Sequence, residues 1–236
     1  MSDVQRYDLP VAVTLRVQSR SGRVRVIAEP RDDVEARGER LEATEQDDGR
    51  VLQVRAGRGS GSLEVRCPAG TDIVVGTHSG SVRLEGDLGD VSVTTVSGSI
   101  EVDAADQADL RSMGGSIQIN TCRDRCRLST VSGTITGGVA GSVAASSMAG
   151  GIKFGRVRGA FKARSVSGSI EAACDGEGPI KLKTVSGRVS IKLPDGTAPH
   201  AFVKSLSGRV ECVCPPGDDV RIDAMSVSGS IQVGPA

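Results

Sequence analysis

The sequence predicts an all-β fold: a single-stranded parallel β-helix, or β-solenoid, of about ten coils with roughly 18-residue repeats, plus an irregular N-terminal capping region. Three observations support this. The phrase VSGSI stands at residues 96–100 and returns at 166–170 and 227–231. The glycine of this phrase recurs at a nearly constant interval, and apolar residues alternate with polar ones on both sides of it.

The glycine of each Ser-Gly corner gives the register, so it is position 0 of its repeat. These corner glycines are Gly61, Gly80, Gly98, Gly115, Gly133, Gly150, Gly168, Gly187, Gly208 and Gly229, with successive gaps of 17 to 21 residues. Glycine suits a corner because it accepts a positive φ and has no Cβ. A further copy, at Gly22, precedes a charged insertion at 29–50. We therefore expect an N-terminal strand and cap region at 1–52 and solenoid repeats at 53–236.

Apolar residues recur at fixed positions around the corner, which indicates two short strands per repeat. Positions −7, −5, +2 and +4 are mostly Val, Ile or Leu, and we expect them to be buried. Position −2 is also apolar, as in Val96 and Met148, and we expect it to point inward as well. A β-sandwich has no reason to keep these positions constant, and a propeller blade needs about 40 residues or more. Stacking of equivalent strands explains both the constant apolar positions and the short repeat length.

Hydroxyl residues surround the corner, and we expect those at positions −3, −1 and +1 to face outward. Position −1 supplies a candidate ligand ladder: Ser79, Ser97, Ser132, Ser167, Ser186, Ser207 and Ser228. Two interpretations stay open for these hydroxyls. They can bond the neighbouring coil in a tight corner, or they can present a regular array that binds a glycan or another repeating lattice.

Composition and charge exclude several partners. Lys plus Arg equals Asp plus Glu at 29 each, and the chain has only one Tyr, three Phe and no Trp. A neutral chain with so few rings gives no support for nucleic-acid binding. No signal sequence or apolar run of membrane-spanning length is visible, so we expect no membrane insertion and a cytoplasmic location, with non-classical surface export left open.

The cysteines and histidines do not form a recognisable metal or catalytic motif. Cys122 and Cys126 form C-x3-C and Cys212 and Cys214 form C-x-C, and neither pair has a partner at a familiar zinc spacing. Cys126 and Cys212 fall at inward positions, where a small buried hydrophobe is expected, and a metal site across neighbouring coils is the alternative. His78 also falls at an inward position, and His200 lies in a connection. We expect no catalytic residues, no cofactor and no enzyme activity.

The two ends of the repeat array differ. Residues 31–50 contain twelve charged residues and should form a polar hairpin or short helix that shields the first coil. The last strand, SIQV, is followed only by GPA. An open coil is a sheet edge ready to pair, so the C-terminal coil is a candidate for self-association or for docking a protein partner. Alternatively, Pro235 and the chain end are enough to block pairing.

The recurring Thr/Ser-Val-Ser-Gly-Ser-Ile/Val phrase, from Gly61 to Gly229, resembles the bacterial "putative adhesin" β-strand-repeat family. The resemblance implies a β-solenoid domain of unknown function found on cell-envelope and stress-associated proteins, and it brings no catalytic residues. We expect a non-catalytic structural or interaction protein that presents a rigid β-solenoid surface. The alternative is a carbohydrate- or lattice-binding module that uses the Ser/Thr ladders at the Ser-Gly corner.

Overall fold

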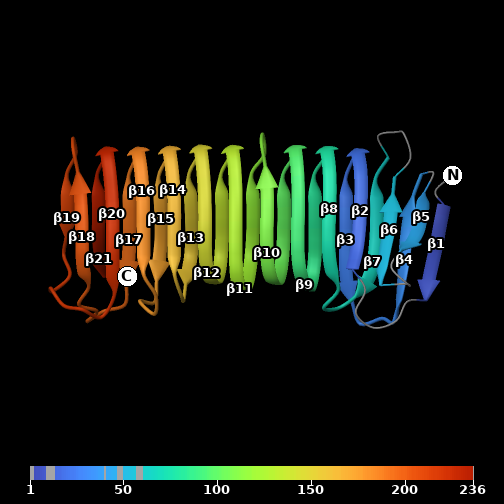
Figure 1. The fold of residues 1–236 in the computed structure, drawn as a ribbon, viewed down its shortest axis with the longest axis horizontal. Coiled ribbons are helices and arrows are strands. Elements are labelled where there is room, and N and C mark those ends of the chain that lie inside the picture. Colours follow the sequence, from blue (N-terminus) through green and yellow to red (C-terminus); the bar gives the residue numbers. More distant parts are fainter. Residues whose placement is uncertain (1–2, 9–13, 40, 47–49, 57–60, 236) are drawn as a thin grey trace. The chain divides into compact units, whose positions relative to one another are not determined.

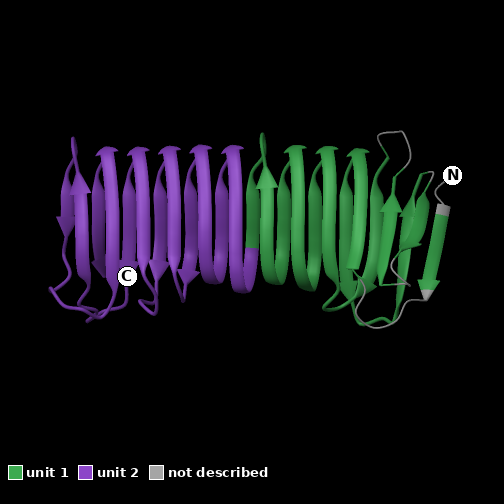
Figure 2. Ribbon diagram, viewed as in Figure 1, with its two compact units in different colours: residues 1–119 green, residues 120–236 purple. Residues whose placement is uncertain are grey.

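The structure is a computed structural model that describes residues 3–8, 14–39, 41–46, 50–56 and 61–235. All regular structure in these residues is β, which confirms the predicted all-β class. The chain divides into two compact units, Met1–Ile119 and Asn120–Ala236, with the division inside strand β11 (Figure 2).

Strand bounds follow the repeat closely. The described part of the first unit contains β1 (Asp3–Asp8), β2 (Thr14–Ser21), β3 (Val24–Glu29), β4 (Asp33–Gly38), β5 (Glu42–Gln46), β6 (Val51–Arg55), β7 (Leu63–Pro68), β8 (Asp72–Ser79), β9 (Val82–Ser97) and β10 (Ile100–Ser112). The remaining strands are β11 (Ile117–Ser132), β12 (Ile135–Ala149), β13 (Ile152–Val157), β14 (Phe161–Ser167), β15 (Ile170–Cys174), β16 (Ile180–Ser186), β17 (Val189–Leu193), β18 (His200–Ser205), β19 (Val210–Cys212), β20 (Arg221–Ser228) and β21 (Ile231–Pro235).

In the second unit, strands before the corner glycines form one parallel ladder and strands after them form another. The first, called ladder A, contains the second half of β12, then β14, β16, β20 and β18. The second, called ladder B, contains the first half of β12, then β13, β15, β17, β21 and β19. Strand β12 belongs to both ladders because it bends between Ala140 and Val143. Each repeat thus gives one strand to each ladder.

The first unit has the same parallel pairing with antiparallel strands at its margin. Strands β6, β2, β8 and the second half of β9 pair in parallel, as do β7, β3 and the first half of β9. The Gly22 repeat, Thr14–Glu29, therefore lies between the Gly61 and Gly80 repeats and is not part of an irregular cap. The predicted boundary at residue 52 stays a prediction, but this segment pairs as a regular repeat.

The described residues of the charged insertion form strands and no helix, and the hairpin that they contribute to, β5 with β6, extends beyond the insertion. Its strands β4 and β5 join different ladders, where β4 pairs antiparallel with β1 and β7, and β5 pairs antiparallel with β6. Glu35 of β4 is buried and lies 2.7 Å from Arg37 and 3.2 Å from Arg6. Residues 40 and 47–49 of the insertion lie outside the described residues. Antiparallel, ion-paired strands thus border the first unit.

The order of the last two repeats in space is the reverse of their order in the chain. Strand β20 pairs with β16 on one side and β18 on the other, and β21 lies likewise between β17 and β19 (Figure 1). The premise that the C-terminal strand is an open edge is therefore wrong. At this end of the second unit the strands with a free edge are β18 and β19, which each have one paired neighbour in the described part of the chain.

The core consists of the predicted inward positions. Residues at −7, −5, +2 and +4, such as Ile73, Leu110, Ile100 and Leu84, are fully buried. Burial of such side chains is the main stabilising contribution in a protein with so few aromatic rings. The largest buried side chain, Phe161, meets Phe154 edge-to-face with ring centroids 5.8 Å apart.

The expectation that position −2 points inward and position −3 points outward is wrong. Residues at −2 are exposed, and residues at −3 face the core. The apolar residues at −2 are exposed: Val96, Met113, Val131, Met148, Val166, Val185, Leu206 and Val227, together with His78. The hydroxyl residues at −3 are buried except for half-buried Ser205: Thr77, Thr95, Ser112, Thr130, Ser147, Ser165, Thr184 and Ser226. A strand that buries −7 and −5 must also turn −3 inward, because side chains alternate with a period of two.

Most corner glycines are required by close backbone approach. A Cβ on Gly168 would overlap the carbonyl group of Gly150, and a Cβ on Gly187 would overlap that of Gly168. The same contacts give the spatial order of the last repeats, because Gly229 meets Gly187 and Gly208 meets Gly229. Similar contacts occur at Gly80, Gly98, Gly115 and Gly150, whereas at Gly61 a Cβ would meet only the side chain of Glu39. Gly133 has a φ of 152°.

Candidate functional site: a groove on ladder A

The exposed side of ladder A carries two parallel columns of side chains. Position −2 gives an apolar column and position −4, two residues earlier on the same strands, gives a second column on the same side. In spatial order, position −4 contains Arg164 on β14, Lys183 on β16, Met225 on β20 and Lys204 on β18, and all four are exposed. The period-two geometry of each strand thus places every cation beside an apolar residue.

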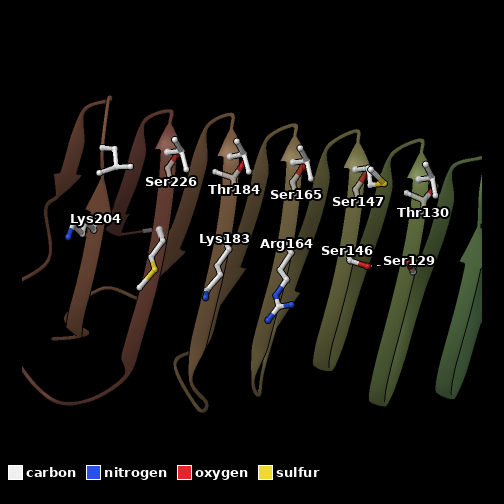
Figure 3. A pocket seen from close by; sticks show the side chains of 17 residues that line it. Ser129, Thr130, Ser146, Ser147, Arg164, Ser165, Lys183, Thr184, Lys204 and Ser226 are labelled. Carbon is white, nitrogen blue, oxygen red and sulfur yellow. Dashed lines mark hydrogen bonds between the residues drawn. The ribbon is translucent and has the colours of Figure 1, made fainter.

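A groove of about 710 Å³ runs along these columns, and Figure 3 shows the side chains that line it. Its lining comes from β11, β12, β14, β16, β20 and β18: Ser129, Thr130, Val131, Ser146, Ser147, Met148, Arg164, Ser165, Val166, Lys183, Thr184, Val185, Lys204, Leu206, Met225, Ser226 and Val227. Its volume lies in the range of sites that bind ligands. We call this surface the ladder A groove.

Some hydroxyls at position −3 bond the main chain of a neighbouring repeat of ladder A. The hydroxyl of Ser165 donates to the carbonyl oxygen of Gly150 at 3.4 Å, and that of Ser205 donates to Gly229 at 3.0 Å. Each bond joins a strand to the corner of a neighbouring repeat. This agrees with the interpretation that the hydroxyls bond the neighbouring coil. Among the described residues, the hydroxyls of Thr184 and Ser226 have no hydrogen-bond partner. The groove therefore has a floor held by main-chain and hydroxyl contacts.

The cations of the groove are unneutralised. Arg164, Lys183 and Lys204 make no ion pair with any residue that the structure describes, and the lining contains no carboxylate. Ladder B differs in part, because Arg156 on β13 lies 2.9 Å from Asp175 and Lys153 on the same strand lies 4.0 Å from Glu171. Free cations beside apolar side chains attract a ligand that is both anionic and apolar.

The serines at position −1 and the two histidines lie outside the ladder A groove. The seven serines of the candidate ladder, Ser79, Ser97, Ser132, Ser167, Ser186, Ser207 and Ser228, are all exposed, which leaves their role as ligand residues a prediction. Five of them, Ser132, Ser167, Ser186, Ser207 and Ser228, belong to the second unit, but no serine at −1 lines the groove. His78 and His200 are exposed and lie in different units.

The cysteines fall into two groups. Cys126 is buried as expected, but Cys212 is exposed because no described strand pairs with the outer side of β19. Burial raises the pKa of the Cys67 thiol to about 11 and that of Cys174 to about 12, which keeps both protonated and unreactive near neutral pH. No group of three His, Cys, Asp or Glu side chains suited to a metal ion occurs among the residues described. A metal site across neighbouring coils gains no support from these residues.

Sequence reasoning missed the groove, although one signal was present. The second unit contains fifteen Lys and Arg against nine Asp and Glu, a formal net charge of +6, whereas the first unit has fourteen against twenty, or −6. The neutral total conceals this division. Counting charge by repeat and placing −2 outward would have identified the surface.

Comparisons with known proteins agree with the fold. The family model described as Toastrack DUF4097 matches residues 14–214. A "putative adhesin" from Bacteroides fragilis has a TM-score of 0.51 at 12% identity, covering 99% of this chain and 97% of that chain. A "putative adhesin" from Parabacteroides distasonis has a TM-score of 0.48 at 12% identity, covering 98% and 97%.

No curated protein matches the chain. No helix in the described residues is long and apolar enough to cross a membrane. The similarity to the Bacteroides fragilis structure concerns the fold, and the family match confirms the resemblance seen in the repeated Val-Ser-Gly-Ser phrase. Because the family model covers most of its length, the chain belongs to the Toastrack DUF4097 family of β-rich proteins.

Proposed function

We propose that this protein is a non-catalytic, adhesin-like interaction module that binds a partner protein through the ladder A groove. The observation that carries this is the pairing of an exposed apolar column with cations that have no acidic partner. Exposed apolar patches of this kind mark interaction surfaces in soluble proteins. Two structurally similar proteins are described as "putative adhesins", which is consistent with a binding role.

A rigid support favours this role. We propose that each unit is a parallel β-solenoid, in which every repeat forms one coil and the corner glycines set the contact between coils. The close approach of consecutive corner glycines and the hydroxyl bonds across repeats support this finer description. The prediction of about ten coils in all belongs to the same proposal. A solenoid holds its surface side chains at a constant spacing, which suits recognition of an element with a similar period.

The occupant that fits best is an acidic amphipathic α-helix of the partner. Neighbouring strands lie about 4.8 Å apart, so the six strands of the groove span roughly 24 Å, the length of a helix of about 16 residues. One helical turn rises 5.4 Å, close to one strand spacing, so apolar residues at i, i+3, i+4 and i+7 can follow the apolar column. Met148 in the apolar column and Met225 in the column at position −4 give the groove adaptable side chains. Acidic residues on the flank of such a helix can pair with Arg164 and Lys183.

The glycan alternative has one observation in its favour, the exposure of all seven serines at position −1. Those serines do not line the groove, and the groove lining has no aromatic ring on which a sugar could stack. We therefore favour the peptide over the glycan.

Titration of a fluorescent helical peptide tests the proposal. The probe is an 18-residue peptide with Leu at helical spacing and Glu on the flank, and its control is the same composition in scrambled order. We expect saturable binding that weakens with salt, because exposed charges are screened over about 8 Å at physiological ionic strength. Lys183→Glu should weaken binding about tenfold or more. Lys192→Glu makes the same charge change at an exposed position on ladder B and should leave the affinity within about twofold.

Two results would reject the groove as a peptide site. One is equal binding of the ordered and scrambled peptides. The other is an equal loss from the Lys183 and Lys192 variants, which would reduce the interaction to net charge. Retention on a polysaccharide column that is abolished by Ser→Val changes at position −1 would instead favour the glycan alternative.

A further inference from the structure

The outer side of β18 and β19 leaves the apolar core of the second unit open. At position +2, Val189 and Ile231 are fully or almost fully buried, but Val210 at the same position of β19 is 43% exposed. At position +4, Val233 is buried whereas Cys212 is exposed. The difference arises because β19 pairs only with β21 in the described chain, so nothing described covers its other side.

This open side carries features that favour pairing with another strand. Its apolar residues include Phe202, 54% exposed, and Val213, 61% exposed. Main-chain donors and acceptors along the outer side of β18 and β19 are without strand partners among the described residues. An unprotected edge of this kind is a template for strand addition. The margin of the first unit differs, since its bordering strands pair antiparallel and the β1–β4 pair contains ion pairs.

We propose that a second copy of this chain covers the β18–β19 edge, so that the protein forms a closed twofold dimer. The twofold axis runs along the strand direction, and β18 of each copy pairs antiparallel with the partner's β19. Inward residues must oppose inward residues, because a one-residue slip would turn every side chain to the other face. The register that opposes Val203 to the partner's Cys212 meets this condition.

That register also makes the outward residues complementary. Lys204 faces the partner's Glu211, and Phe202 faces the partner's Val213. In one copy, neither Lys204 nor Glu211 has an ion-pair partner within the described chain. The symmetry makes each contact twice, and cross-strand pairs of opposite charge and of apolar residues both stabilise antiparallel strands. Because the contact uses both free strands of both copies, the assembly closes at two copies and does not extend to a filament.

Charge exchange tests this register on the full chain. Multi-angle light scattering after size exclusion, under reducing conditions that prevent disulfide formation by Cys212 and Cys214, should give a dimer that dissociates on dilution. Lys204→Glu alone, or Glu211→Lys alone, places like charges opposite each other twice and should raise the dissociation constant about tenfold or more. The double variant, Lys204→Glu with Glu211→Lys, should restore the dimer. Circular dichroism checks that each variant keeps its β content.

Lys192→Glu, on a strand with neighbours on both sides, is the matched control and should leave the dimer unchanged. A protein that is monomeric at every concentration would overturn the proposal. A mass that keeps growing with concentration would also overturn it, because it indicates an open assembly. A double variant no better than the single ones would overturn the register. None of these results depends on a peptide in the ladder A groove, since the readout is molecular mass.

Discussion

Replacement of Gly168 by alanine should be among the most destabilising single-methyl additions in the second unit. An added Cβ would lie 2.6 Å from the carbonyl carbon and 3.2 Å from the next main-chain nitrogen, both in the Gly150 corner, and closer still to the Gly150 oxygen. Ordinary contact needs about 3.4 Å or more. The corner must therefore open by about 0.8 Å to clear the carbonyl carbon and by more than an ångström to clear the oxygen, although β14 is hydrogen-bonded on both sides.

Overpacking of this size costs typically 1–3 kcal/mol, and here the atoms that must move belong to backbone. We therefore expect a loss of about 3 kcal/mol, read from urea unfolding followed by circular dichroism. Gly234→Ala is the matched control in the same unit, since a Cβ there meets nothing within 4 Å. It should change the free energy of unfolding by less than about 1 kcal/mol. Equal effects of the two variants would refute the argument that corner glycines are set by close stacking.

Two further predictions concern ionisable groups. The hydrogen bond from Arg25 to Glu85 lowers the pKa of that carboxyl, so its stabilising contribution is present above the unfolded pKa and is lost as the pH falls through the folded pKa. Glu85→Gln should therefore flatten the acid side of the stability profile measured by urea midpoints below about pH 5, and an unchanged profile would contradict the pairing. At concentrations low enough to dissociate the proposed dimer, native protein should react with a maleimide at exposed Cys212 and half-exposed Cys214, whereas Cys174, whose burial raises its pKa to about 12, should react only after unfolding. Labelling of Cys174 at the same rate as Cys212 would show that the core opens readily.

The sequence was sufficient to predict the strands, the corner and most of the core, because these depend on local alternation. It was misleading at position −2, where apolar character suggested burial. The period of two, anchored by Ile73 and Val75 in one repeat, turns Thr77 inward and His78 outward. Strand geometry thus outweighed residue hydrophobicity, and the exposed apolar residues became part of the candidate site.

The exchanged order of the last two repeats was harder to predict, because pairing between distant strands leaves little trace in a repeated phrase. One trace exists: the last two gaps between corner glycines are 21 residues, against 17 to 19 for the earlier gaps from Gly61. The longer connections let the chain skip one strand position, a step of about 10 Å along each ladder, and then return to the position that was skipped. Near-identical repeats can occupy the same strand position in the ladders. The length of the connections was therefore the feature of the sequence that carried information on the order of the last two repeats.

Methyl NMR of methionine is the measurement that tests the central claim most directly. The chain has four methionines, of which Met148 and Met225 line the ladder A groove, whereas Met113 is exposed at position −2 of a repeat in the first unit, the position of Met148, and does not line it. On titration with the acidic amphipathic peptide, the methyl signals of Met148 and Met225 should shift together and saturate while that of Met113 stays in place. Equal shifts at Met113, or no shift at Met148 and Met225 despite binding, would contradict the assignment of the groove as the binding surface.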